Sequence, residues 1–186
     1  MTGFRRVGDG VAARFVRPEA AIIRDLVEQV VELVEPSTEA DRSGPDPEAD
    51  ELARMVGLGP DEDAELPDDP VLARLLPDAY RDDPDAASEF RRFTESGLRS
   101  GKVTAAMTLL ETLPPGGGRI KLTPDQAEAW LRSLNDVRLA LGTRLGVTDD
   151  FDALDEHTEV DDPRYAYVQV YQWLAYLQGS LVAALS

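Results

Sequence analysis

One stretch of the chain holds the side chains that could bind a metal ion or transfer protons. Asp149, Asp150 and Asp152 lie close to His157, which is the only histidine of the 186 residues. Carboxylates and an imidazole can share a divalent cation, and a carboxylate with a shifted pKa can act as an acid or a base. Their spacing matches neither an EF-hand loop nor a zinc-binding helix. A metal-dependent or carboxylate enzyme is therefore the most remote hypothesis, and we expect no enzymatic activity, no metal and no cofactor.

Two groups of arginines could bind phosphate or an acidic surface. Near the start of the chain, Arg5, Arg6 and Arg14 have few acids around them, which predicts a small positive end. Further on, Arg91 and Arg92 lie between two phenylalanines, and this pattern can bind phosphate or stack on bases. In the simpler interpretation the phenylalanines belong to the core and these arginines pair with nearby acids.

Composition limits the partners that the chain can have. With 36 acidic and 19 basic residues, the chain has a net charge of −17, which repels nucleic acid and anionic membranes at long range. Most of this excess lies in residues 36–69, an aperiodic stretch that predicts an acidic loop or disordered segment. The absence of cysteine excludes disulfides, thiol catalysis and cysteine metal sites. We find no signal-peptide pattern and no apolar run that could span a membrane, so we expect a cytoplasmic protein.

The elements that must position these residues are organised around residues 123–147. Thr123 and Gln126 form a helix start, because each of their side chains can satisfy a free backbone group at the helix N-terminus. Apolar residues then recur every three or four positions up to Leu145, and Gly146 ends the helix. This pattern predicts an amphipathic helix that needs a partner surface.

Two helices carry candidate contacts for a partner. Asn135, Asp136 and Arg138 lie on the polar side of the helix just described, although a solvated face is the simpler interpretation. The last helix, expected over residues 163–185, is apolar around more of its circumference than a surface helix needs, with Trp173 and Tyr176 off its main stripe. Either this helix is central in a bundle, which we favour, or its second face forms a homodimer.

The remaining elements follow from turn and helix signals. Residues 3–7 and 11–16 flank a glycine-bearing turn and predict a β-hairpin, for which residues 119–122 could provide a third strand. Further helices are expected over residues 18–34, 48–56, 70–76, 84–96 and 101–113. The sequence therefore predicts a single domain of mainly α class. It would be a bundle of about six helices with a small antiparallel sheet and an acidic connector over residues 148–162.

The tripeptide Asp-Asp-Pro occurs three times. In each case the second aspartate could cap a helix whose first residue is the proline. We therefore interpret Asp69, Asp83 and Asp162 as helix caps and not as metal ligands.

Three separated motifs resemble a known family. They are D-P-V-L-A-R-L-L-P-D-A-Y, E-F-R-R-F-T-E and L-N-D-V-R-L-A-L-G-T-R-L-G-V, in that order. They are similar to an uncharacterised actinobacterial domain-of-unknown-function family. The genes of this family commonly lie beside that of the ClpS adaptor, and its members are often labelled transcriptional regulators. The resemblance implies a lineage and a genomic neighbourhood, and it assigns no catalytic residues.

The sequence leads to one main hypothesis and one alternative. We expect a non-enzymatic regulatory or adaptor module that acts through protein contacts, with a partner in transcription or Clp-related machinery, or with a second copy as a homodimer. The acidic segment would steer a basic partner, and surplus apolar surface on the last helix would form a contact. The alternative is a transcriptional regulator that contacts DNA through the basic hairpin or the Arg91 face, or that binds RNA polymerase or a sigma factor. The net charge makes nucleic acid the less favoured partner.

Overall fold

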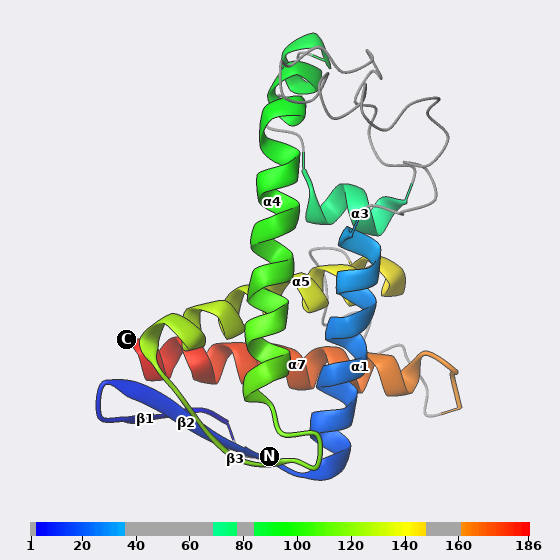
Figure 1. The fold of residues 1–186 in the computed structure, drawn as a ribbon. Coiled ribbons are helices and arrows are strands. Elements are labelled where there is room, and N and C mark those ends of the chain that lie inside the picture. Colours follow the sequence, from blue (N-terminus) through cyan, green and yellow to red (C-terminus); the bar gives the residue numbers. More distant parts are fainter. Residues whose placement is uncertain (1–2, 36–68, 78–83, 148–160) are drawn as a thin grey trace.

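The computed structural model describes residues 3–35, 69–77, 84–147 and 161–186, and it leaves the side chains of residues 84–92 undescribed. Figure 1 shows the helices on one side of a small sheet. The expected mainly α architecture with a small antiparallel sheet is confirmed. Its elements in chain order are β1 (Arg5–Val7), β2 (Gly10–Phe15), α1 (Arg17–Val34), α3 (Pro70–Leu75), α4 (Pro84–Thr112), β3 (Gly118–Leu122), α5 (Pro124–Leu145) and α7 (Tyr165–Leu185).

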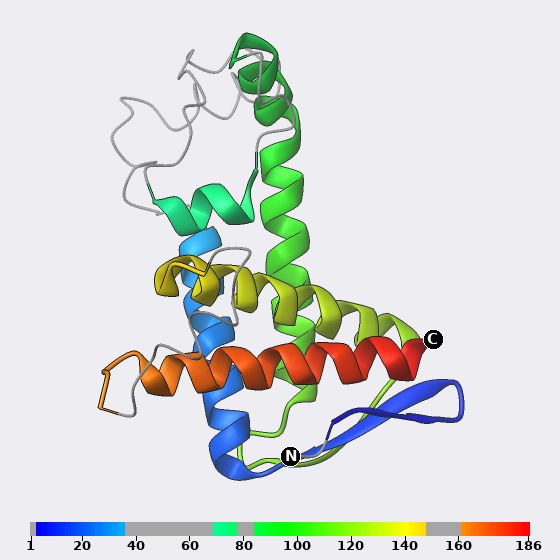
Figure 2. The ribbon, with the colours of Figure 1, turned by 180° about the vertical axis from the view of Figure 1, so that it is seen from behind.

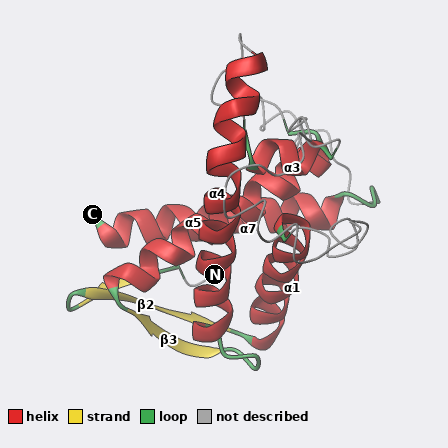
Figure 3. Ribbon diagram, turned by 45° about the horizontal axis from the view of Figure 1, so that its top comes forward, coloured by secondary structure: helices red, strands yellow, loops and turns green. Residues whose placement is uncertain are grey.

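The sheet is built as the sequence predicts. Its order is β1-β2-β3 with both pairs antiparallel, and it lies at one end of the molecule (Figure 3). Gly8 supplies the positive φ of 62° in the turn between β1 and β2, a conformation that costs glycine little. Along β2, Val11, Ala13 and Phe15 are buried in the core, so this face of the sheet is covered by helices.

Helix α5 has the expected start and end. The Thr123 hydroxyl accepts from the N–H of Gln126 at 3.3 Å, and the Gln126 side chain accepts from the N–H of Thr123 at 3.0 Å. Gly146 ends the helix with a φ of 68°. The helix contacts α1, α3, α4 and α7, and Figure 2 shows α7 lying along it. Its predicted apolar stripe is buried at Ala127, Trp130, Leu134, Val137, Leu141 and Leu145.

An aromatic cluster joins the sheet to α5 and α4. The rings of Phe15 and Trp130 are stacked with centroids 5.7 Å apart, and Phe4 meets both rings edge-on. The indole Nε1 of Trp130 donates to the Thr112 hydroxyl at the end of α4 at 2.7 Å. The inner face of the sheet is thereby fixed against two helices.

The middle of α4 differs from the expectation. The sequence predicts two helices, over 84–96 and 101–113, but α4 is one continuous helix. Gly97 and Gly101 therefore lie inside it, at a cost of about 1 kcal/mol each relative to alanine. Contacts with other helices hold this region helical: the Arg99 guanidinium donates to the carbonyl of the last residue of α1 at 2.5 Å, and an ion pair with α5 follows one turn later.

Two of the three expected helix caps lie within the described residues. The carboxylate of Asp69 accepts from the N–H groups of the second and third residues of α3, at 2.7 and 3.3 Å, which confirms the cap. The cap expected at Asp162 is wrong: helix α7 begins at Tyr165, two residues later than expected, its N-cap residue is Arg164, and no side chain forms a capping hydrogen bond there. The reason is that the carboxylate of Asp162 accepts from the N–H of Arg164 and pairs with its guanidinium at 2.8 Å, which closes a turn ahead of the helix. Asp83 lies outside the described residues.

Other expectations also fall outside the described residues. They are the helix over 48–56, nearly all of the acidic segment 36–69 and most of the connector 148–162. The prediction of a single domain remains untested. None of the helices in the described part of the chain is long and apolar enough to cross a lipid bilayer.

Candidate functional site

The outer face of the sheet brings together cations from all three strands. Arg5 is paired with Ala12, Ala12 with Lys121, and Arg14 with Arg119. Paired residues of antiparallel strands point to the same face, and successive residues alternate between faces. Because the intervening residues of β2 are buried in the core, these five lie on the face away from the helices. We call the four exposed cations Arg5, Arg14, Arg119 and Lys121 the basic sheet face.

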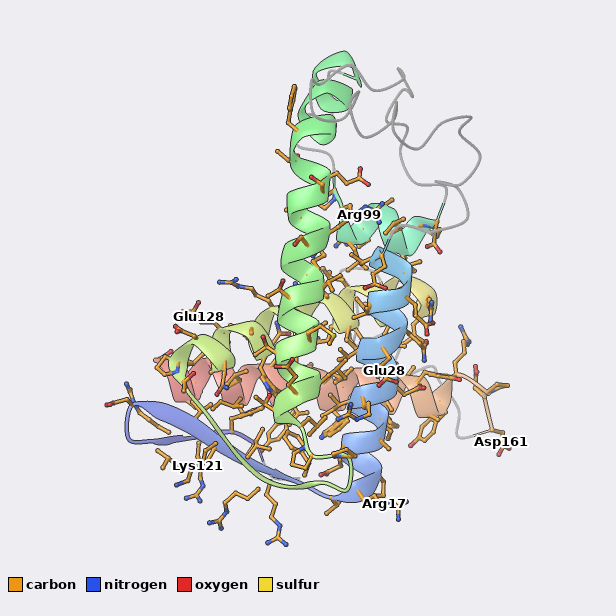
Figure 4. All side chains as sticks on the ribbon, in the orientation of Figure 1. Arg17, Glu28, Arg99, Lys121, Glu128 and Asp161 are labelled. Carbon is orange, nitrogen blue, oxygen red and sulfur yellow. The ribbon has the colours of Figure 1, made fainter. Side chains whose placement is uncertain are left out.

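The basic sheet face has no counter-ions on the sheet. The three strands contain no acidic residue, and none of the four cations forms an ion pair or hydrogen bond with any other residue that the structure describes. Figure 4 shows Lys121 on the side of the sheet away from the helices. Ala12 is only 2% exposed although it lies outside the core cluster, because the long side chains of its neighbours flank it. Four positive charges therefore share one surface of a chain whose net charge is −17.

The structure separates the arginines that the sequence grouped together. Arg5 and Arg14 lie on the basic sheet face, but Arg6 is paired with Val11 and therefore points to the opposite face. Arg6 is nevertheless exposed. Whether any of the three contacts a partner remains a prediction.

Two members of the basic sheet face, Arg119 and Lys121, are not among the candidate contacts predicted from the sequence. The sequence predicts only that they belong to a strand. The alternation of these cations with buried Ile120 and Leu122 was the available signal, because it places both charges on one face of β3. Their pairing with β2, more than a hundred residues earlier, depends on the fold.

Asp136 faces another helix and not solvent. It is 5% exposed, and its carboxylate accepts from the ammonium of Lys102 on α4 at 2.6 Å. Burial raises the pKa of Asp136, and the hydrogen bond and charge of Lys102 oppose this in part. The pair joins α5 to α4 at a position that is largely shielded from solvent.

Asn135 and Arg138 are joined by a residue of α7. The side chain of Gln178 accepts from the Arg138 guanidinium and donates to the Asn135 oxygen at 3.3 Å. The guanidinium also lies 3.4 Å from the Tyr171 hydroxyl and 5.2 Å from the centre of the same ring. These two candidates therefore hold α5 against α7, whereas Asp136 holds it against α4.

Helix α7 combines core residues with an uncharged exposed side. Its 21 residues include no acidic or basic side chain. Trp173 is 8% exposed and belongs to the core, whereas Tyr176 and Val182 are 48% and 47% exposed. Helix α7 thus packs into the core through one side, as favoured from the sequence, and it also exposes apolar side chains to solvent on its other side.

The other candidates cannot be placed. The side chains of Arg91 and Arg92, and all of Asp149, Asp150, Asp152 and His157, lie outside what the structure describes. Within the described residues, no three histidine, cysteine, aspartate or glutamate side chains gather as metal ligands would.

Comparison with known proteins gives matches over almost the whole chain. The oxidative stress regulator AosR of Mycobacterium tuberculosis (strain ATCC 25618 / H37Rv) is 37% identical over 180 residues, which cover 90% of this chain and 78% of that protein. The protein of the same name from Mycobacterium bovis gives the same values. No solved structure matches. The gene neighbourhood with ClpS remains a prediction. The domain of unknown function DUF2017 matches residues 1–185, and the chain therefore belongs to the DUF2017 family, in agreement with the resemblance seen in its motifs.

Proposed function

We propose that this chain is a non-enzymatic cytoplasmic regulator of the response to oxidative stress that binds a protein partner through the basic sheet face. The observation that carries the proposal is the group of four exposed cations without described counter-ions. An acidic protein surface would supply the missing charges. The regulatory role is supported by the names of the mycobacterial relatives.

Two features favour a protein over a nucleic acid. The outer face of the strands carries no aromatic side chain, whereas sheets that bind single strands stack bases on aromatic rings. In addition, the net charge of −17 repels a polyanion as a whole. A protein can place acids against the basic sheet face and neutral or basic residues against the rest of the chain.

Contact with DNA phosphates is the second candidate, because the same four cations could neutralise phosphates. Each contact would add about −0.9 to the slope of log affinity against log salt. If the basic sheet face binds a protein and not DNA, charge reversal on this face need not change the salt dependence of any DNA binding.

The composition also limits how this chain could respond to an oxidant. Its 186 residues contain no cysteine, so a thiol switch within them is excluded. We propose that the partner, or a protein acting before it, detects the oxidant and that this chain transmits the signal.

Self-association through α7 is part of the proposal. Two copies of a chain of charge −17 repel each other. The uncharged outer side of α7, with Tyr176 and Val182 exposed, is a surface on which this repulsion is small. Aromatic side chains and a depletion of charge are also typical of interface cores.

The test is affinity capture with charge-reversed variants. The tagged full chain would be incubated with a nuclease-treated actinobacterial lysate, and bound proteins identified by mass spectrometry. We expect a specific protein to be captured by the parent chain, to be lost with Arg14→Glu, and to be retained with Arg132→Glu, which makes the same change of charge at an exposed arginine of α5. Equal capture by all three proteins would contradict the proposal, and capture that needs intact DNA would favour the second candidate.

A further inference from the structure

A hollow of about 500 Å³ lies among α3, the last turns of α5 and the first half of α7. Arg74 and Arg138 line it, together with Thr143, Tyr171 and small or apolar residues from the last turns of α5 and the two positions after it. Its volume is within the range of sites for small organic molecules. Arg138 lies 14 residues after the first residue of α5, which follows β3 closely. This is roughly 21 Å of helix, so the hollow is distinct from the basic sheet face.

The hollow is cationic. Two arginines line it, and its described lining includes no acidic residue. The C-terminal end of α5 contributes a partial negative charge of about half a unit. Among the described residues, two full positive charges outweigh this dipole, so this lining favours an anion.

Arg138 provides the more specific argument. It is half-buried, yet the groups that its guanidinium contacts, Gln178 and Tyr171, are both neutral. Its Nε is buried without a hydrogen-bond partner in the described structure. A charge withdrawn from water is normally paired with an opposite charge. Here no described carboxylate pairs with Arg138, while Gln178 and Tyr171 fix its orientation.

We infer that this hollow is a binding site for a small organic oxyanion, whose carboxylate or phosphate group pairs with Arg138. Arg74 lies on the rim, where it is exposed, and adds a second positive charge. The apolar residues at the end of α5 contact the carbon part of the ligand. This inference is independent of the proposed function.

The test measures binding of two probes to the full chain, pyrophosphate for phosphate ligands and citrate for carboxylate ligands. Calorimetry gives the affinity, and thermal unfolding gives the stabilisation, with potassium chloride at equal ionic strength as the reference. We expect at least one probe to raise Tm by about 5–10 °C at roughly a hundred times its Kd. The better probe identifies the class of oxyanion.

Variants assign the binding to the hollow. Arg138→Gln should weaken the better probe about 10–100-fold, as expected for loss of hydrogen bonds to a charged group. Arg74→Gln should weaken it about 2–5-fold, and this exposed position keeps the test valid if Arg138→Gln fails to fold. Arg132→Gln, on the same helix but outside the hollow, should leave the affinity unchanged.

Three results would overturn the inference. The first is no binding of either probe at millimolar concentration, and the second is unchanged binding in both Arg74→Gln and Arg138→Gln. The third is binding of a probe to a variant in which Asp149, Asp150 and Asp152 are changed to asparagine, with no binding to the parent. That result would mean that carboxylates of the chain itself pair with Arg138 in the parent, and that no separate ligand is needed.

Discussion

Arg14 and Arg119 lie directly opposite each other on the adjacent strands β2 and β3. Like charges in this relation destabilise a sheet, and neither arginine has a counter-ion among the described residues. The repulsion would be relieved if the acids of a partner were placed between the two guanidinium groups. The pair of Arg14 and Arg119 is unfavourable in the free chain and would become favourable on binding, as expected for a surface that binds an acidic partner.

Replacement of one of these arginines should raise stability and lower binding together. Arg14→Thr removes the repulsion and retains a residue that favours strands, so the free energy of unfolding should increase by about 0.2–1 kcal/mol. Urea unfolding measures the stability, and the capture experiment measures the binding. A variant that is less stable than the parent would show that Arg14 contributes to folding and not only to recognition.

The ion pair between α4 and α5 should matter for stability. Lys102→Met leaves the carboxylate of Asp136 buried without its donor, and we expect the free energy of unfolding to fall by about 1–3 kcal/mol. The same change at exposed Lys121 should stay within about 0.5 kcal/mol of the parent. If urea unfolding shows equal effects at both lysines, the pair contributes little to the packing of the two helices.

The pH dependence of stability should report on Asp136. Burial raises its pKa above the ordinary value of 3.8, so between these two values the folded chain holds a proton that the unfolded chain has released. The contribution of this group is thus fully present below pH 3.8 and is lost as pH rises through the raised pKa. The parent should lose stability relative to Asp136→Asn over this window.

Urea unfolding at several pH values between about 3 and 7 measures this difference. Asp125→Asn, at an exposed carboxylate of the same helix, is the control for the general effect of losing one negative charge. A parent chain that gains stability relative to Asp136→Asn as the pH rises through this window would contradict the expected sign.

The exposed side of α7 should control self-association. We expect the parent chain to sediment as a dimer and Tyr176→Arg/Val182→Arg to sediment as a monomer, because the variant places like charges across the interface. Met107→Arg, at a residue 45% exposed on α4, should remain a dimer. A parent chain that sediments as a monomer at all accessible concentrations would remove self-association from the proposal.

Treatment of the purified chain with peroxide should leave partner binding unchanged within about twofold. With no cysteine and three methionines, the only sulfur chemistry left is methionine oxidation, and exposed Met107 lies on α4 and not on the sheet. The capture experiment is repeated after the peroxide has been removed. A loss of capture that methionine sulfoxide reductase reverses would instead make methionine oxidation the switch.

Local signals made the start and end of α5 and the three-stranded sheet predictable. Thr123, Gln126 and Gly146 form or allow contacts within one turn of the helix ends, and Gly8 provides the positive φ that the hairpin turn needs. Each of these signals depends only on residues close in the sequence. The continuity of α4 was not predictable in this way. Its glycines weaken the helix locally, whereas the contact of Arg99 with α1 and the pair between Lys102 and α5 arise only in the folded chain.

Only the part of the candidate site that depends on local sequence was predictable. The excess of arginine near the N-terminus indicated a basic surface, and Arg5 and Arg14 belong to it. Strand alternation alone removes Arg6 from that face. Arg119 and Lys121 join the face only through the register between β2 and β3, which local composition does not encode.

The most direct test of the account is site-specific photo-crosslinking in living cells. A photoreactive residue would replace exposed Val7, which lies two residues from Arg5 on the same face of β1, in one variant and exposed Met107 on α4 in the control. The account predicts a light-dependent, nuclease-resistant protein adduct at position 7 but not at position 107. No protein adduct at position 7, or an adduct with nucleic acid alone, would contradict the proposal that the basic sheet face binds a protein.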